Sequence, residues 1–269
     1  MEKKVFVLFC FSWLCLLCPI LAAERTDTLR LAAHRGGITQ GAFDEYDPAS
    51  IDSAISKGYW MLEIDVRMTK DCQVIAMHDD NFLRIYGVNK LARDLTLEEV
   101  KQLQALRGGY APLTFEEVCR KCAGKTNIML DIKEDKSSIS EAFLTSIRNT
   151  LEAYGLQSTV YILQKEYKPF FKFGKYAVRM PDIYTVIGNA SQKEELAEHY
   201  FLFEAGCRMT ADAVRLCQKY GIEVCPSINF GHYRYEDYRG AVQRDIEYLK
   251  RCDVRFFQID SDFDKYFDL

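Results

Sequence analysis

The sequence predicts an α/β protein built as a closed (β/α)₈ barrel, and three observations predict it. Short apolar runs alternate with amphipathic helical patterns, which is typical of repeated βα units around a parallel sheet. Charged residues gather where these runs end, and the chain of 269 residues has the length of one such barrel. An open, doubly wound sheet is the alternative, although the glycine fingerprints of nucleotide-binding loops are absent. The eight expected strands lie near Leu29, Met61, Ile128, Val160, Tyr176, Tyr200, Glu223 and Arg255.

Proline and glycine mark where the expected helices begin and end. The first helix begins at Pro48 and ends at Gly58. Proline is common at the first position of a helix and glycine just after its last turn. Later helices show apolar residues at helical spacing before a glycine or a new strand. In chain order we expect strands at 29–33, 59–66, 127–132, 160–163, 176–180, 200–203, 223–228 and 255–259, and helices at 48–58, 95–106, 114–124, 138–154, 166–173, 192–199, 210–220 and 238–251.

A small β-hairpin insertion is expected after the second strand. Glu63 and Asp65 are two apart in an apolar run, so on a strand their carboxylates face the same side. The polar turn at 69–71 is too short for a parallel crossover. The return run 74–77 therefore folds back and brings His78 beside Asp65. An ordinary edge hairpin with solvated ends is the alternative.

The first residues have the pattern of a secretory signal peptide, which we assign to residues 1–23, with one barrel domain at 24–269. Lys3 and Lys4 precede the apolar run 5–21 and two alanines. Leu21 makes the cleavage site imperfect, so an uncleaved anchor is the alternative. The large Leu17 argues against a lipoprotein anchor. Since no later run could span a bilayer, we expect no stable membrane insertion of the mature chain, which would be secreted or periplasmic.

Composition excludes some classes of function. The formal net charge is −4 and there is no basic tract, which argues against a nucleic-acid partner. Seven cysteines follow the signal, and an odd number cannot pair completely within the chain. Cys119 and Cys122 have C-x-x-C spacing without a second metal-binding pair nearby, so we expect buried apolar side chains rather than a zinc site. The oligomeric state stays open.

Chemistry in such a barrel lies at the carboxyl ends of the strands. Glu63, Asp65 and Asp131 come from neighbouring strands and would repel one another unless a cation held them. Oxygen ligands suit Mg²⁺ or Ca²⁺. A simple salt bridge between Asp131 and Lys133 is the alternative for that pair.

Two histidines and two cations border these acids. His34 and His78 are candidates for proton transfer, and Arg35 and Lys133 for binding a phosphoryl group. Together they point to phosphodiester cleavage. His232, in an aromatic loop, is a weaker candidate for substrate contact. Glu204 and Asp260 are left as supporting or structural residues.

Four segments, at 32–37, 63–71, 78–79 and 130–133, make the chain resemble the glycerophosphodiester phosphodiesterase family. The resemblance implies a TIM barrel that hydrolyses small glycerophosphodiesters to glycerol 3-phosphate and an alcohol. It also implies roles for seven residues: general acid and base for His34 and His78, phosphate contact for Arg35 and Lys133, and metal ligation for Glu63, Asp65 and Asp131.

The chain departs from the family pattern at three places. Ala49 stands where the family has a glutamate, Asp131 is one methylene shorter than the usual residue, and Pro226-Ser227 replaces a late tryptophan. Asp44 or Glu45 could supply the carboxylate lost at Ala49. Secreted phospholipases of the sphingomyelinase D type resemble the same two-histidine barrel and have aspartate at the third metal position. A lipid headgroup substrate, or a non-catalytic phosphodiester-binding barrel, is therefore the alternative.

Overall fold

A computed structural model describes residues 28–135, 137, 139–190, 193–233 and 237–267, so the expected signal peptide at 1–23 lies outside it. Eight parallel strands follow one another around a ring, and pairing of the first with the second closes it at Ala32–Met61 and Ala33–Leu62. The predicted (β/α)₈ barrel is confirmed. In chain order its strands are β1 (Arg30–Ala33), β2 (Met61–Met68), β6 (Asn127–Ile132), β7 (Tyr161–Ile162), β8 (Lys175–Val178), β9 (Tyr200–Ala205), β10 (Glu223–Ile228) and β11 (Phe256–Ile259).

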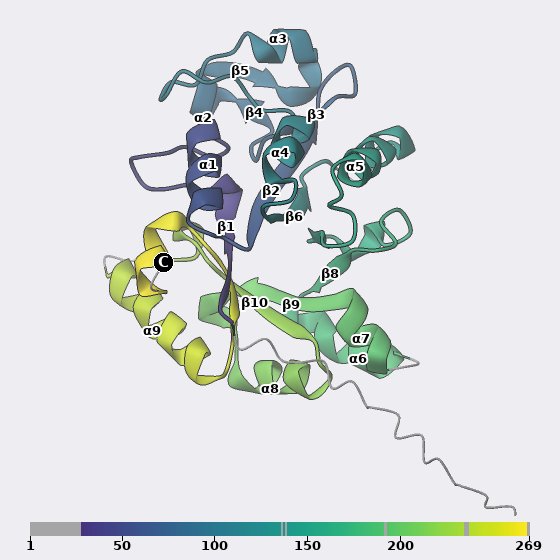
Figure 1. The fold of residues 1–269 in the computed structure, drawn as a ribbon, viewed down its shortest axis with the longest axis vertical. Helices are drawn as coiled ribbons and strands as arrows, with labels where there is room; N and C mark the ends of the chain where they lie inside the picture. Colours follow the sequence, from purple (N-terminus) through teal and green to yellow (C-terminus); the bar gives the residue numbers. More distant parts are fainter. Residues whose placement is uncertain (1–27, 136, 138, 191–192, 234–236, 268–269) are drawn as a thin grey trace, which may run out of the picture.

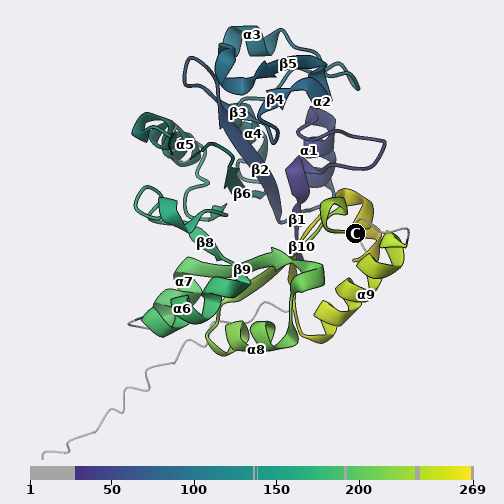
Figure 2. The same ribbon diagram turned by 180° about the vertical axis from the view of Figure 1, so that it is seen from behind.

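Helices surround these strands on the outside (Figures 1 and 2). Several of these helices are capped by side chains: the Thr114 hydroxyl accepts from the Glu117 N–H, and the Glu117 carboxylate accepts from the Thr114 N–H. Asp47 precedes the helix that begins at Pro48, and its side chain accepts from the Ala49 N–H. The outer helices are α1 (Pro48–Ser56), α4 (Phe115–Cys122), α5 (Glu141–Ala153), α6 (Ile183–Asn189), α7 (Lys193–His199), α8 (Ala211–Lys219) and α9 (Tyr238–Arg251).

The apolar core has two layers because strand side chains alternate between the faces of the sheet. One layer fills the barrel interior and includes Met61, Met129, Phe201 and Phe256. The other lies between the strands and the helices, where Phe115, Phe143 and Phe257 are among the fully buried side chains. The cysteines at 119, 122, 217 and 225 are buried and unpaired, in agreement with the prediction.

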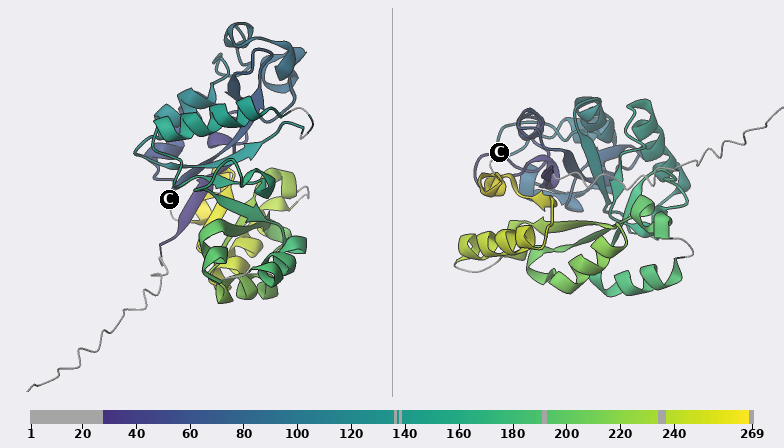
Figure 3. Two further views of the ribbon diagram at one scale, coloured as in Figure 1. Left: turned by 90° about the vertical axis from the view of Figure 1, so that its right-hand side faces the viewer. Right: turned by 60° about the horizontal axis from the view of Figure 1, so that its bottom comes forward.

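The insertion after the second strand is larger than expected. The predicted hairpin is present, since β3 (Val74–Ala76) pairs antiparallel with β2. A second ladder and two short helices follow and form their own apolar cluster, which projects from the barrel (Figure 3). The expected helix at 95–106 ends at Lys101. The added elements are β4 (Asn81–Phe82), α2 (Leu83–Tyr86), β5 (Val88–Leu91) and α3 (Leu97–Lys101).

Two other helix predictions differ from the structure. The expected helix at 166–173 is only a 3₁₀ turn at Lys165–Tyr167, because Pro169 has no N–H to donate to a carbonyl in the preceding turn of a helix. The helix α6 was not predicted. In the part of the chain that the structure describes, no helix is long and apolar enough to cross a membrane.

Candidate active site

Three carboxylates converge at the carboxyl ends of β2 and β6. Asp65 and Asp131 are register partners, and Glu63 lies two residues before Asp65 on the same face. One oxygen of each lies within 4.8 Å of the others. Glu63 and Asp65 are buried, at 2% and 1% exposure. The structure therefore brings together the three acids proposed from the sequence as metal ligands, and their oxygen donors fit a hard divalent cation.

The charges of this cluster are only partly compensated by the protein. Burial raises the pKa of Glu63, and repulsion from Asp65 raises it further. Burial and the Asp131 carboxylate likewise raise the pKa of Asp65. Two cations contact these acids: Lys133 Nζ lies 3.1 Å from Asp65 Oδ1 and 2.6 Å from Asp131 Oδ2, and Arg35 Nε lies 3.8 Å from Asp65 Oδ2. The salt bridge considered for Asp131 and Lys133 is thus present, within the same cluster as the proposed metal ligands.

Hydrogen bonds orient each carboxylate. Glu63 Oε2 accepts the Arg35 backbone N–H at 2.8 Å, and the Tyr46 hydroxyl donates to Asp65. Gln164 Nε2 donates to Asp131 Oδ1 at 2.5 Å. Arg35 adopts a left-handed backbone conformation with φ 48°, which costs a non-glycine residue free energy and recurs at functional sites. This turn lets both the amide and the side chain of Arg35 face the acids.

His34 is held by an aspartate from the last strand. Its Nδ1 lies 2.5 Å from Asp260 Oδ1, and its Nε2 lies 4.0 Å from Glu63 Oε2. The other Asp260 oxygen accepts the Phe230 N–H at 2.6 Å. Burial lowers the pKa of His34, but the Asp260 carboxylate outweighs it, and the net shift is upward. From the sequence, Asp260 was expected to be a supporting or structural residue. The sequence signal for its contact with His34 was its position directly after β11.

His78 is held in the same manner at the start of the insertion. Its Nδ1 lies 2.8 Å from Asp79 Oδ1, and Arg84 Nε donates to Asp79 Oδ2 at 2.7 Å. Burial opposes ionisation of Asp79, but the His78 and Arg84 bonds dominate and lower its pKa. Arg67 fixes the local backbone, since its Nε donates to the His78 carbonyl at 3.0 Å.

Glu45, rather than Asp44, lies in the site. It is 2% exposed, and its Oε2 accepts from Arg35 Nη1 at 2.8 Å and from Arg84 Nη2 at 2.7 Å. Glu45 thus provides a buried carboxylate that contacts the site through Arg35. It binds two arginines and is not one of the three converging acids among the described residues. The sequence offered Asp44 or Glu45 without choosing between them, and it did not predict the two arginine partners of Glu45.

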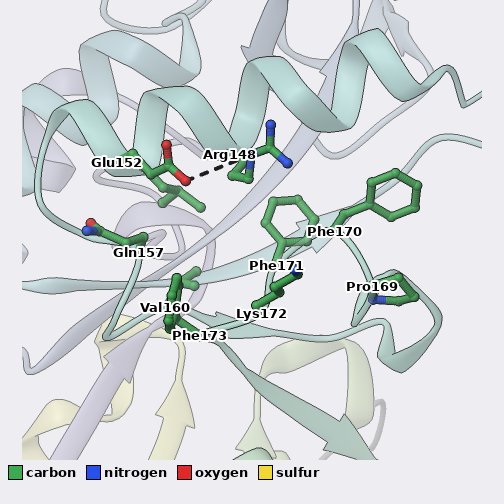
Figure 4. Close-up of a pocket in the computed structure, with 10 residues that line it drawn as sticks. Arg148, Glu152, Gln157, Val160, Pro169, Phe170, Phe171, Lys172 and Phe173 are labelled. Carbon is green, nitrogen blue, oxygen red and sulfur yellow. Dashed lines mark ion pairs between the residues drawn. The ribbon is translucent and has the colours of Figure 1, made fainter.

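All seven predicted site residues line one cavity of about 450 Å³ at this end of the barrel. His232, the weaker candidate, lines it too. Its far wall, from the ends of β8 to β10, carries Arg179 and Arg208, which the sequence reasoning missed. A smaller cavity of about 260 Å³ lies beside α5 (Figure 4). Its charged Arg148 and Glu152 pair with each other at 3.8 Å, and none of the converging acids lines it.

A family model matches residues 34–171, which include all seven predicted site residues. The chain belongs to the glycerophosphoryl diester phosphodiesterase family. Human lysophospholipase D GDPD1 is 34% identical over 135 residues, which are 49% of this chain and 40% of that protein. A glycerophosphodiester phosphodiesterase of Bacillus altitudinis is 31% identical over 117 residues, 41% of this chain and 46% of the relative. The chain spans about half the length of the curated relatives it matches.

Solved structures share the fold over most of the barrel. A glycerophosphoryl diester phosphodiesterase from Parabacteroides distasonis superposes with a TM-score of 0.70 at 19% identity, covering 90% of this chain and 87% of that one. A phosphodiesterase of Oleispira antarctica, in complex with the product sn-glycerol-3-phosphate, superposes with a TM-score of 0.68 at 18% identity, covering 89% and 97%. These likenesses extend the family's fold to the second half of the chain, beyond the matched segment.

Proposed function

We propose that this protein is a metal-dependent phosphodiesterase that hydrolyses glycerophosphodiesters to glycerol 3-phosphate and an alcohol. One observation carries the proposal: two histidines, each bonded through Nδ1 to an aspartate, border three converging carboxylates with Arg35 and Lys133 between them. Acids, bases and cations around one cavity are what phosphoryl transfer to water needs.

The histidines are suited to exchange protons with the two oxygens that change bonding at phosphorus. Because Asp260 and Asp79 engage Nδ1, the Nε2 atom of each ring is left for substrate or water. One ring accepts a proton from the attacking oxygen and the other gives one to the leaving oxygen. Glu63, Asp65 and Asp131 would hold a Mg²⁺ or Ca²⁺ ion, which when bound supplies positive charge against the phosphoryl oxygens. Arg35 and Lys133 add the protein's own positive charge beside these acids.

A phospholipase D activity on a lipid headgroup is the second candidate. Asp131, one methylene shorter than the family's usual residue, favours it, and human GDPD1 is named a lysophospholipase D. The substrates of the two candidates share the phosphodiester and differ in whether an acyl chain is attached. A barrel that binds phosphodiesters without turnover was suggested by Ala49. Two observations argue against it: both histidines are bonded to an aspartate, and Glu45 binds Arg35.

We also propose that the mature barrel acts outside the cytoplasm. The support is the pattern of residues 1–23, a positive start, an apolar run and two alanines. Sequencing the N-terminus of the protein recovered from culture medium or periplasm tests this. A mature start near residue 24 agrees with it, and an intact Met1 in the cytosol contradicts it.

The activity is tested by measuring glycerol 3-phosphate release from glycerophosphodiesters. The wild-type protein and His34→Ala are compared with Mg²⁺ or Ca²⁺, and again with a chelator. We expect release only from the wild type with metal. Release that neither the chelator nor the mutation reduces would overturn the mechanism. Choline or ceramide-phosphate release from acylated substrates, without glycerol 3-phosphate from deacylated ones, would favour the phospholipase.

A further inference from the structure

The far wall of the active-site cavity carries positive charge that the proposed mechanism does not use. Arg179 follows β8 and Arg208 follows β9, so both lie at the carboxyl ends of strands, as the site residues do. Both line the cavity, together with His232 after β10. Arg35, Lys133 and the three acids of the proposed metal site lie on or after β1, β2 and β6, whereas Arg179, Arg208 and His232 follow β8, β9 and β10, in another arc of the ring. The two arginines are therefore suited to a part of the substrate other than the reacting phosphoryl group.

Arg179 forms no ion pair with an acid of the described chain. Among residues 28–135, 137, 139–190, 193–233 and 237–267, no carboxylate oxygen forms a salt bridge with it within 4.0 Å. Its guanidinium donates to the Phe203 carbonyl at 3.2 Å and lies 4.8 Å from the centre of the Phe203 ring. Desolvation lowers the pKa of Arg179, and the Arg208 cation adds to this against opposing effects of Glu204 and Asp131. An unpaired cation beside a second cation favours an anionic ligand.

Arg208 reinforces this charge. It is exposed, and its single acidic partner in the described chain is Glu204, at 3.1 Å. His232 also lines the cavity, and its Nδ1 lies 3.1 Å from the Ser227 carbonyl oxygen, which leaves Nε2 for a hydrogen bond to a ligand. Burial lowers the pKa of His232, so it is a neutral hydrogen-bonding group at neutral pH. The wall therefore holds two guanidinium groups and one imidazole that can bond oxygen atoms of a ligand.

The same wall is unsuited to a quaternary ammonium group. Such groups are bound by open aromatic faces, in cages of several rings. The aromatic residues that line the cavity are Phe203 and Phe230. The Phe203 ring already has Arg179 over it, and Phe230 packs on Phe263 at 4.7 Å between ring centres. A choline head would meet two cations and no free cage.

We propose that this wall, formed by Arg179, Arg208 and His232, selects phosphodiesters whose headgroup carries a negative charge of its own, such as a second phosphate. The inference rests on the proposed function and names its substrate class. Because glycerol is uncharged, the anionic part is the headgroup esterified to the phosphoryl group. Guanidinium forks bind phosphate oxygens in pairs, which suits a phosphomonoester.

The test compares three deacylated substrates that differ in headgroup charge: glycerophosphoinositol 4-phosphate, glycerophosphoinositol and glycerophosphocholine. We expect kcat/KM for the first to exceed that for the second roughly tenfold or more, the effect of one charge-assisted hydrogen bond. Glycerophosphocholine is expected to be the poorest. Equal values for all three, or a preference for choline, would overturn the proposal.

Substitutions test whether Arg179 and Arg208 cause the preference for the charged headgroup. In Arg179→Gln and Arg208→Gln, kcat/KM for glycerophosphoinositol 4-phosphate is expected to fall toward the value for glycerophosphoinositol. The value for glycerophosphoinositol itself should change little. Arg215→Gln is the matched control, since Arg215 is an exposed arginine on α8 that pairs with Asp212 and does not line the cavity. If Arg179→Gln lowers kcat/KM equally for all substrates, Arg179 binds the reacting phosphoryl group and the proposal is wrong.

A binding measurement separates this inference from the proposed activity. The variant His78→Asn is titrated calorimetrically with the same three compounds in the presence of Mg²⁺ or Ca²⁺. Tighter binding of glycerophosphoinositol 4-phosphate supports the wall's selectivity even if no substrate is turned over. Absence of turnover in the wild type with such binding would contradict only the hydrolase. Turnover without a preference for the charged headgroup would contradict only the proposed selectivity.

Discussion

Two glutamates on the same barrel have opposite surroundings. Glu223 begins β10, at the amino end of the barrel, where its oxygens lie 2.6 Å from Arg30 Nη2 and 2.9 Å from Lys175 Nζ. Burial opposes its ionisation, but Lys175 and Arg30 outweigh this and lower its pKa to about 2. Glu63, near the other end, faces two more carboxylates, and burial and Asp65 raise its pKa. One carboxylate is fully compensated by the protein, and the other is not.

The difference is the one expected between a structural charge and the metal-binding charge that we propose for Glu63. A glutamate whose partners are all on the chain contributes to folding and needs no ligand. A buried glutamate among like charges remains unfavourable until a cation binds, so binding releases repulsion that folding left in place. Substitution of Glu63 should therefore lower activity, whereas substitution of Glu223 should lower stability.

The largest effect is expected for His78→Ala. Removing a proton-transfer group should lower kcat by roughly 10²- to 10⁴-fold, because the leaving or attacking oxygen loses its acid or base. Steady-state release of glycerol 3-phosphate measures this. The melting temperature should stay close to that of the wild type, since the His78 side chain is 31% exposed. An unchanged kcat would remove His78 from the mechanism.

Glu63→Gln tests the uncompensated charge directly. We expect activity to fall at least about 100-fold, since even outer partners of a metal site can cost that much. In chelator, the free energy of unfolding should not fall and should rise by about 1 kcal/mol, because like-charge repulsion is removed. Urea unfolding gives that value, and added Mg²⁺ or Ca²⁺ should no longer raise the melting temperature. A clear loss of stability in chelator would mean that Glu63 is structural.

Glu223→Gln is the matched substitution at the other end. We expect a loss of roughly 2 kcal/mol at pH 7, with kcat unchanged. The folded-state pKa of about 2 lies below the ordinary 4.5, so the wild-type advantage is present above pH 4.5 and is lost as the pH falls toward 2. Unfolding of both proteins across this range checks the sign. An advantage that grows on acidification would contradict the ion-pair explanation.

The smallest effect is expected for Arg84→Gln. The guanidinium bonds Asp79 and Glu45 but lies behind His78, so its loss should lower kcat about tenfold and change KM little. Arg84→Lys should restore part of the loss. Arg93→Gln, at an exposed position in the same insertion, is the control and should leave kcat unchanged. An equal loss in both variants would indicate general damage to the insertion.

Much of the fold was predictable from the sequence because buried parallel strands are continuous apolar runs. The predicted strands at 127–132 and 223–228 have the observed bounds. Prediction failed where signals are short: the strands of the second ladder span two and four residues, and Asn81–Phe82 has no periodicity to read. Pro169 should have excluded a helix through it.

The grouping of the acids and histidines was predictable because strand ends and i, i+2 spacing place them. Their partners were not, because they depend on closure of the barrel. His34 and Asp260 are separated by 226 positions and meet only when β1 pairs with β11. Arg179 likewise follows a strand in the half of the chain without family motifs, and only the folded cavity shows which way it faces.

Glu45 has a consequence for engineering this scaffold. One of its carboxylate oxygens, Oε2, accepts from Arg35 of the barrel and from Arg84 of the insertion. The other, Oε1, is buried and has no hydrogen-bond partner among the residues that the structure describes. Grafting another protein's loop in place of residues 81–113 would leave Oε2 with Arg35 alone and Oε1 still unbonded. The insertion is therefore not an interchangeable module: a working chimera must bring its own arginine, or replace Glu45 at the same time.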